Sequence, residues 1–109
     1  MTATFGVLAE ESRRRILDLL AEEERPVGDL VALLSLSQPA ISKHLKVLRE
    51  AGLVQSRPDA QRRIYRVSPE PLREVDEWLA PYRLQWSGHR TALERHVEIM
   101  EANEGEPWA

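Results

Sequence analysis

Residues 35–54, SLSQPAISKHLKVLREAGLV, decide the fold. Ser37 can accept a backbone hydrogen bond as an N-cap, and Pro39 falls in the first turn, where its missing N–H costs nothing. Gly52 can end the helix, and a strand-forming stretch follows at once. We therefore predict a capped helix over residues 37–51 that leads directly into a strand.

The two faces of this helix differ in chemistry. Ile41, Leu45 and Leu48 recur at i, i+4 and i+7 and form a core stripe. The remaining positions are small, amide or basic, which suits a helix that enters a DNA major groove by its N-terminal end, although an ordinary amphipathic surface helix shares this pattern. His44 is open between a phosphate contact and packing against the preceding helix. The candidate DNA contacts are Ser37, Gln38, Pro39, Ala40, Ser42, Lys43, His44 and Lys46.

A second short helix precedes this one. Apolar residues repeat along one side of residues 27–34, after a chain interruption at 25–29, and the helix ends near Ser35. Two short helices joined by residues 35–37 make a helix-turn-helix. A further helix lies upstream. Its apolar face is formed by Ile16, Leu17, Leu19 and Leu20, and the basic run 13–15 marks its start. Those arginines contact phosphate or lie on a solvated face.

A β-hairpin follows the helix-turn-helix. Residues 53–57 and 62–67 have strand character, and residues 58–61 are the turn candidate. Alternation places Arg63, Tyr65 and Val67 on one face and the residues between them on the other. A hairpin in this place is a wing, whose basic tip can reach the sugar-phosphate backbone or a minor groove. Tyr65 packs or makes contact, and the candidate backbone contacts are Arg57, Gln61, Arg62 and Arg63.

Charge is distributed unevenly along the chain. The 109 residues carry a net charge of −3, which by itself argues against a nucleic-acid partner. Residues 38–66, however, hold seven Lys or Arg against two acidic residues, a net charge of +5. Residues 68–109 hold four Arg against nine acidic residues, a net charge of −5. The central segment is therefore the predicted DNA side.

Composition excludes several classes of protein. No apolar run approaches the roughly 18 residues of a membrane span, and no signal peptide is visible, so we expect a soluble cytoplasmic protein that associates with the nucleoid through its operator. There is no cysteine, which excludes disulfides and thiolate metal sites. A glycine-rich phosphate loop and a His-carboxylate cluster at metal spacing are also absent, so an enzyme is not expected.

The C-terminal third carries a heptad pattern. Apolar and aromatic residues recur every seven positions from Leu72 to Met100, and a second set follows three residues after each. So small a domain cannot bury a seam of this length by itself, which favours a homodimer, although packing on the same subunit is the alternative. Pro81 marks a kink or break. The candidate interface residues are Phe5, Leu8, Leu72, Val75, Leu79, Tyr82, Trp86, His89 and Leu93.

The sequence resembles the ArsR/SmtB family of bacterial winged-helix repressors. The likeness lies in residues 13–20, 36–54 and 62–66 and extends over about residues 5–80. It implies four helices, a hairpin and a further helix, with residues 4–8 as the first helix. It also implies dimerisation through the first and last helices, and repression that an inducer relieves.

The sequence departs from the family at the positions where many members bind a metal ion. The helix at 28–34 has neither Cys nor His, so soft-metal sensing by that route is excluded, and Trp78 follows Asp76 and Glu77 where the family's other metal site has His. No cofactor is therefore expected. His89 and His96 leave three alternatives: a metal held across a dimer with Glu94 or Glu98, an imidazole-filled seam, or a pH-sensitive interface.

The sequence thus predicts a mainly α protein with a small β-hairpin, of the winged helix-turn-helix class. Residues 1–68 form the DNA-binding core, residues 69–102 the dimerisation helix or kinked helix pair, and residues 103–109 a frayed tail. The expected partners are double-stranded DNA with an inverted repeat and a second copy of the chain, with no membrane and an unknown inducer. A winged-helix module that binds another protein is the competing function.

Overall fold

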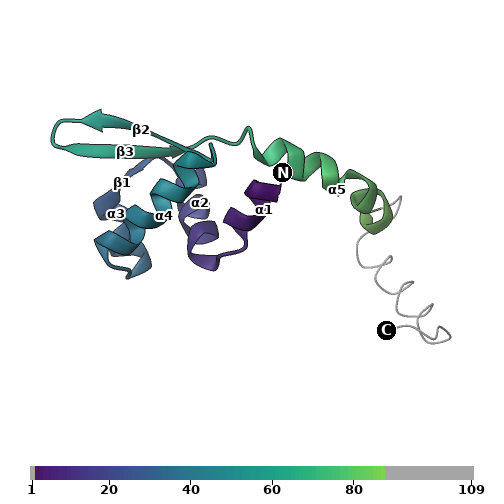
Figure 1. The fold of residues 1–109 in the computed structure, drawn as a ribbon, viewed down its shortest axis with the longest axis horizontal. Coiled ribbons are helices and arrows are strands. Elements are labelled where there is room, and N and C mark those ends of the chain that lie inside the picture. The colour runs from purple at the N-terminus through teal and green to yellow at the C-terminus, as the bar shows by residue number, and fades with distance from the viewer. Residues whose placement is uncertain (1, 88–109) are drawn as a thin grey trace. The chain divides into compact units, whose positions relative to one another are not determined.

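The computed structural model of this chain describes residues 2–87 (Figure 1). Its elements follow the order helix, helix, short strand, helix, helix, hairpin, helix, so the predicted winged helix-turn-helix class is confirmed. The helices are α1 (Thr2–Leu8), α2 (Glu11–Glu22), α3 (Val27–Leu34), α4 (Gln38–Glu50) and α5 (Leu72–Ser87). The strands are β1 (Arg25–Pro26), β2 (Val54–Asp59) and β3 (Arg62–Val67).

The chain divides into two compact units, Met1–Val75 and Asp76–Ala109. The first unit has one apolar core, to which α2, α3, α4 and the sheet all contribute. The predicted α4 stripe of Ile41, Leu45 and Leu48 lies in it and is at most 1% exposed. Burying a side chain of this size contributes about 1.5–3 kcal/mol, which is why α4 cannot turn its polar face inward.

Local signals set the ends of α4. Ser37 has extended backbone, and its Oγ accepts a hydrogen bond of 3.2 Å from the N–H of Ala40, so the predicted N-cap is confirmed. At the other end Gly52 has a φ of 78°, and the N–H of Leu53 donates to the carbonyl of Leu48 at 2.9 Å. A glycine adopts this left-handed conformation at little cost, which ends the helix and starts β2.

The sheet has three antiparallel strands in the order β1-β3-β2, where the sequence predicted only a two-stranded hairpin. Arg25 and Pro26, expected to interrupt the chain, pair with Tyr65 and Ile64 of β3. A strand of two residues has no periodic signal of its own, and its pairing with β3 creates it.

The hairpin turn is tighter than predicted. Pro58 and Asp59 belong to β2 and pair with Arg63 and Arg62, so only Ala60 and Gln61 remain between the strands. Pro58 is tolerated because β2 is an edge strand, where a missing N–H removes little of the ladder. Ala60 takes a left-handed φ of 58° to close this two-residue loop.

Both faces of β3 are partly covered. Ile64 and Tyr65 point to opposite faces but are 6% and 9% exposed. Tyr65 belongs to the apolar core, which resolves its two predicted roles in favour of packing.

The arginines near the start of α2 hold the end of α1. Arg13 and Arg14 donate to the carbonyls of Val7 and Leu8, at 3.5 and 2.7 Å. These carbonyls lie in the last turn of α1, where no helical N–H is available to them. The helix itself begins at Glu11, ahead of the basic run that was expected to mark its start.

Helix α5 runs through Pro81, where the sequence predicted a kink or break. The rings of Trp78 and Tyr82 lie 5.1 Å apart, and those of Tyr82 and Trp86 lie 6.4 Å apart. All three side chains are between 42% and 53% exposed. No helix among residues 2–87 is long and apolar enough to cross a membrane. The predictions for His89, Leu93 and His96 concern residues outside the described range.

Candidate nucleic-acid interface

The polar face of α4 is open to solvent. Five of the predicted contacts, Gln38, Pro39, Ser42, Lys43 and Lys46, are exposed, while Ala40 is half-buried. The ammonium groups of Lys43 and Lys46 make no ion pair or hydrogen bond within residues 2–87, so both charges are available to a ligand. The N-cap Ser37 is exposed as well, but its hydroxyl is engaged by the helix itself.

His44 lies apart from this group. Its side chain is 15% exposed, and its Nε2 lies 3.5 Å from Oε1 of Glu10, the residue that precedes α2. Its Nδ1 is buried and has no hydrogen-bond partner in the described part of the chain. The structure therefore places His44 between α2 and α4, away from the open face with which the sequence grouped it.

The wing, residues 54–67, carries all four predicted contacts at its surface. Arg57, Gln61, Arg62 and Arg63 are exposed. Each arginine is already held by a neighbour. Nη2 of Arg57 donates to Oε1 of Glu24 at 2.7 Å, Arg62 pairs with Asp59 at 3.3 Å, and Arg63 donates to Oγ of Ser56 at 3.1 Å.

The pair between Arg57 and Glu24 has an electrostatic consequence. The hydrogen bond from the Arg57 guanidinium to the Glu24 carboxylate, together with the charge of that carboxylate, raises the pKa of Arg57 above its usual value. An arginine guanidinium is protonated at ordinary pH, so Arg57 is positively charged with or without this pair. The Glu24 carboxylate partly neutralises this charge, and so limits how strongly Arg57 can attract another anion.

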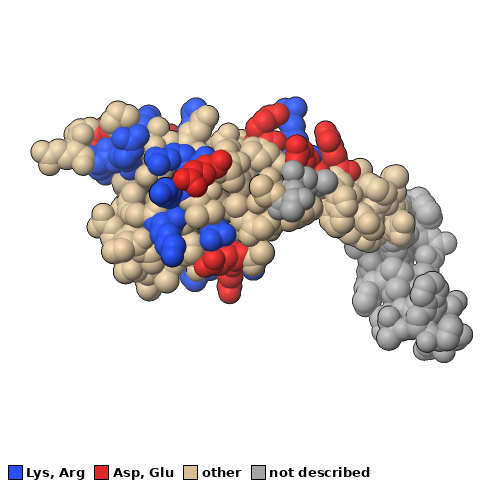
Figure 2. Space-filling view, viewed as in Figure 1, with Lys and Arg blue, Asp and Glu red and all other residues tan. Residues whose placement is uncertain are grey.

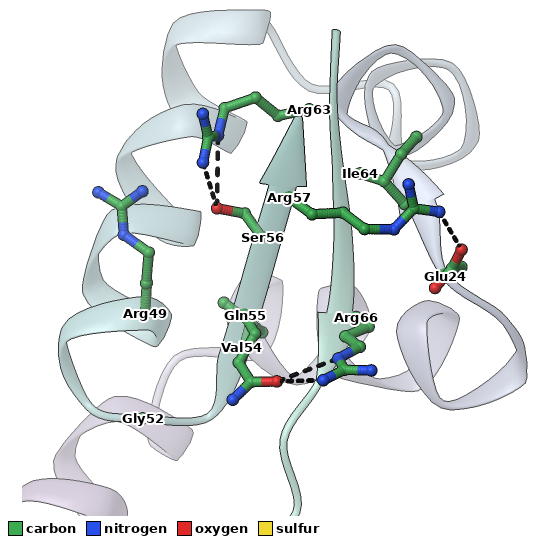
Figure 3. Close-up of a pocket in the computed structure, with 10 residues that line it drawn as sticks. All are labelled: Glu24, Arg49, Gly52, Val54, Gln55, Ser56, Arg57, Arg63, Ile64 and Arg66. Atoms are coloured by element: carbon green, nitrogen blue, oxygen red, sulfur yellow. Dashed lines mark hydrogen bonds and ion pairs between the residues drawn. The ribbon is translucent and has the colours of Figure 1, made fainter. Parts of the chain in front are cut away.

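A groove lies between the C-terminal end of α4 and the wing (Figure 3). It encloses about 700 Å³ and is lined by Arg49 of α4, by Arg57 and by Arg63 and Arg66 of β3. Oε1 of Gln55 accepts two hydrogen bonds from Arg66, at 2.8 and 3.0 Å.

Arg49 and Arg66 contribute to the net charge of +5 predicted for residues 38–66, but neither residue was among the predicted contacts. Helical periodicity could have added Arg49 to the predicted contacts, because Arg49 lies on the same side of α4 as Gln38 and Ser42. Arg66 was assigned to the face of β3 opposite Arg63. Arg63 and Arg66 nevertheless line the same groove, because the groove extends around the edge strand β2.

Figure 2 shows the charge pattern on one face of the molecule. Lysine and arginine gather over the β2–β3 hairpin and over the helical body next to it. Acidic residues lie beside them on the same face (Figure 2), so positive charge is concentrated there without being unbroken.

The predicted dimer residues differ in exposure. Leu8 and Leu72 pack partly against the core of their own unit, and Val75 and Leu79 are half-buried. Phe5, Tyr82 and Trp86 are exposed by 38%, 42% and 53%. The sequence treated Trp78 only as the residue in place of a metal-binding His. It extends the aromatic row of Tyr82 and Trp86. The heptad pattern missed it because the seam position in that turn falls on Leu79.

Residues 2–87 contain no group of three His, Cys, Asp or Glu side chains that could hold a metal ion. Asp76, which the resemblance places in a damaged metal site, instead accepts a hydrogen bond of 2.7 Å from Arg83.

Known proteins are similar to this chain in sequence and in fold. The model of the arsR family of bacterial regulatory proteins matches residues 10–56. The HTH-type transcriptional regulator Rv2034 of Mycobacterium tuberculosis is 46% identical over 68 residues, which are 62% of this chain and 64% of that protein, or just under two thirds of its length. The arsenic resistance transcriptional regulator ArsR1 of Pseudomonas putida is 41% identical over 74% of this chain and 73% of its own.

Two solved structures of transcriptional regulators are similar to this chain in both sequence and fold. A possible transcriptional regulator for arsenical resistance is 34% identical, with a TM-score of 0.66 over 93% of this chain and 95% of that one. HlyU from Vibrio cholerae, in its reduced form, is 36% identical, with a TM-score of 0.62 over 74% of this chain and 86% of its own. These relatives are regulators of transcription, which confirms both the resemblance and the expectation that the chain is not an enzyme.

Proposed function

Because the chain belongs to the arsR family of bacterial regulatory proteins, we propose that it is a homodimeric repressor of transcription. It binds a palindromic operator with α4 in the major groove and with the wing against the backbone or the adjacent minor groove. Its place of action is the nucleoid in the bacterial cytoplasm.

The open face of α4 is the observation that carries this proposal. Ile41, Leu45 and Leu48 anchor the helix in the core, so Lys43 and Lys46 must point outward. A lysine without an internal partner can replace the counterions of a phosphate, which is the main source of affinity for duplex DNA. Gln38 and Ser42 stand nearer the N-terminal end and can hydrogen-bond to base edges in a major groove.

Helix α5 supports the dimer. Leu79, Tyr82 and Trp86 lie along one side of the helix, and the two aromatic residues are about half exposed. Large aromatic side chains in such a row are typical of protein interfaces. A two-fold axis between two copies would place two α4 helices about 34 Å apart, the length of one turn of DNA.

The proposal assigns no role to a metal ion. Among residues 2–87, no group of three His, Cys, Asp or Glu side chains could hold one. His89 and His96 keep the alternatives given above, since they lie outside the described range. Binding of another protein by the wing and α4 remains the competing function. The positive charge of residues 38–66 favours a phosphate-rich partner over most protein surfaces.

Salt dependence tests the DNA contact directly. We measure the affinity of the protein for a 25-base-pair duplex of arbitrary sequence by fluorescence anisotropy, over a range of salt concentrations. If Lys43 and Lys46 each neutralise a phosphate, the slope of log affinity against log salt becomes shallower by about 0.9 per lysine in K43A and K46A. Arg73→Ala removes the same charge from an exposed site near the start of α5 and should leave the slope unchanged.

Selection from random duplexes tests the rest of the proposal. Bound sequences should contain an inverted repeat with half-sites about one helical turn apart, and the footprint should be two-fold symmetric. A single unrepeated motif, bound by one copy of the chain, would contradict the homodimeric mode.

A further inference from the structure

The groove between α4 and the wing holds more positive charge than its own side chains balance. Glu24 is the one carboxylate that lines it, and Arg57 engages it at 2.7 Å. Arg63 and Arg66 donate only to the neutral oxygens of Ser56 and Gln55.

The guanidinium of Arg49 has no ion pair or hydrogen bond within residues 2–87, although the Arg49 carbonyl accepts the N–H of Gly52 at 3.0 Å. Three guanidinium charges in a cavity of about 700 Å³ are thus left without a carboxylate.

Such a site attracts a particular class of ligand. Concave walls that carry charge of one sign raise the local concentration of ions of the opposite sign, here anions. The planar guanidinium matches the oxygens of a phosphate in pairs, which makes arginine the preferred residue for phosphate recognition. The ligand expected here is therefore a phosphate group.

The proposed mode of DNA binding brings phosphates to this place. If α4 occupies the major groove and the wing lies at the adjacent minor groove, then one strand of the backbone separates the two. That strand has to pass between the helix and the wing, where the groove lies.

We infer that consecutive backbone phosphates of the operator duplex lie in this groove, where Arg49 and Arg66 contact them beside Arg63. The inference rests on the proposed function and adds two contacts to it. A free phosphate compound could use the same chemistry, so the experiment must separate the two sources.

The experiment replaces the two new arginines with glutamine, which is similar in length and uncharged. For R49Q and R66Q each, the slope of log affinity against log salt should become shallower by about 0.9, and by about 1.8 for the double variant. Arg73→Gln is the matched control and should keep the slope of the unmodified chain. Arg49→Lys retains the charge and should keep the slope as well. We expect equal urea midpoints for all variants, because Arg49, Arg66 and Arg73 are exposed. Equal midpoints would show that a change in slope does not come from a folding defect.

Three results would overturn the inference. If K43A and K46A weaken binding as expected while R49Q and R66Q keep the full slope, the groove is not a backbone site and the proposed function stands. If the unmodified chain shows no salt-dependent binding to duplex, the proposed function fails and this inference fails with it. If calorimetry with pyrophosphate shows binding that R49Q abolishes, and the DNA slope is unchanged, the groove belongs to a free anion.

Discussion

Oε1 of Glu24 lies 2.7 Å from Nη2 of Arg57, so a carboxylate that follows α2 is joined to the wing across 33 positions of sequence. Arg57 is one of the residues proposed to contact the DNA backbone. A guanidinium that is held by a carboxylate cannot at the same time give all its donors to a phosphate. If Arg57 contacts DNA as proposed, this pair competes with that contact, and removing the Glu24 carboxylate should release Arg57.

Glu24→Gln should strengthen DNA binding. The substitution removes the competing charge, and since an exposed ion pair has a small effect, we expect the affinity for duplex to rise about two- to five-fold. Fluorescence anisotropy at fixed salt measures it. Glu70→Gln is the matched control, because Glu70 pairs with Arg73 outside the groove and its loss removes the same charge. A weaker affinity in Glu24→Gln would mean that the pair holds Arg57 in place for DNA.

Ser37→Ala should destabilise the fold through α4. The substitution removes the oxygen that accepts the N–H of Ala40, which costs about 1 kcal/mol in the free energy of unfolding. Urea denaturation followed by circular dichroism measures it. Ser37→Asp keeps an acceptor and should retain most of the stability. Ser42→Ala, in the exposed middle of the same helix, should be neutral or slightly stabilising. Equal losses from the two alanine variants would show that the cap is not responsible.

Ala60→Gly and Gly52→Ala should change stability in opposite directions. Both positions have left-handed backbone, with φ of 58° and 78°. Glycine relieves the strain at position 60, for an expected gain of about 0.5 kcal/mol, whereas alanine at position 52 should cost about 1 kcal/mol.

The expected loss of stability in Gly52→Ala does not come from a steric clash. An added Cβ would meet only Cγ of Pro71 at 3.5 Å, an ordinary contact. Urea midpoints of the two variants check both signs, and a stabilised Gly52→Ala would refute the backbone explanation.

Tyr82→Ser combined with Trp86→Ser should weaken the proposed dimer. The change removes two exposed aromatic rings from one side of α5, and we expect the dissociation constant to rise at least tenfold, a difference of about 1.4 kcal/mol. Sedimentation velocity over a range of concentrations measures it. Leu84→Ser is the control, because Leu84 is 77% exposed but lies on the opposite side of the helix from both rings. Dissociation by Leu84→Ser alone would place the interface on the other face.

Much of the fold was determined by the sequence itself, because its signals are local. The hydroxyl of Ser37 lies three residues from the N–H that it caps, and Ile41, Leu45 and Leu48 meet on one face because a helix turns every 3.6 residues. The same holds for Gly52, because a glycine can adopt a positive φ and end the helix without help from residues distant in sequence. Neighbours a few residues apart were sufficient for α4, for the wing and for the family resemblance.

The tertiary structure alone decided which polar groups meet. Arg25 and Pro26 become a strand only because β3 lies beside them, and His44 turns toward Glu10 because α2 packs against α4. The groove that collects Arg49 and Arg66, and the carboxylate that holds Arg57, likewise depend on how distant segments pack. The physical reason is that a surface charge has no periodicity that selects its partner. Burial of the apolar core sets the positions of the backbones, and the charged side chains pair with whatever this brings within reach.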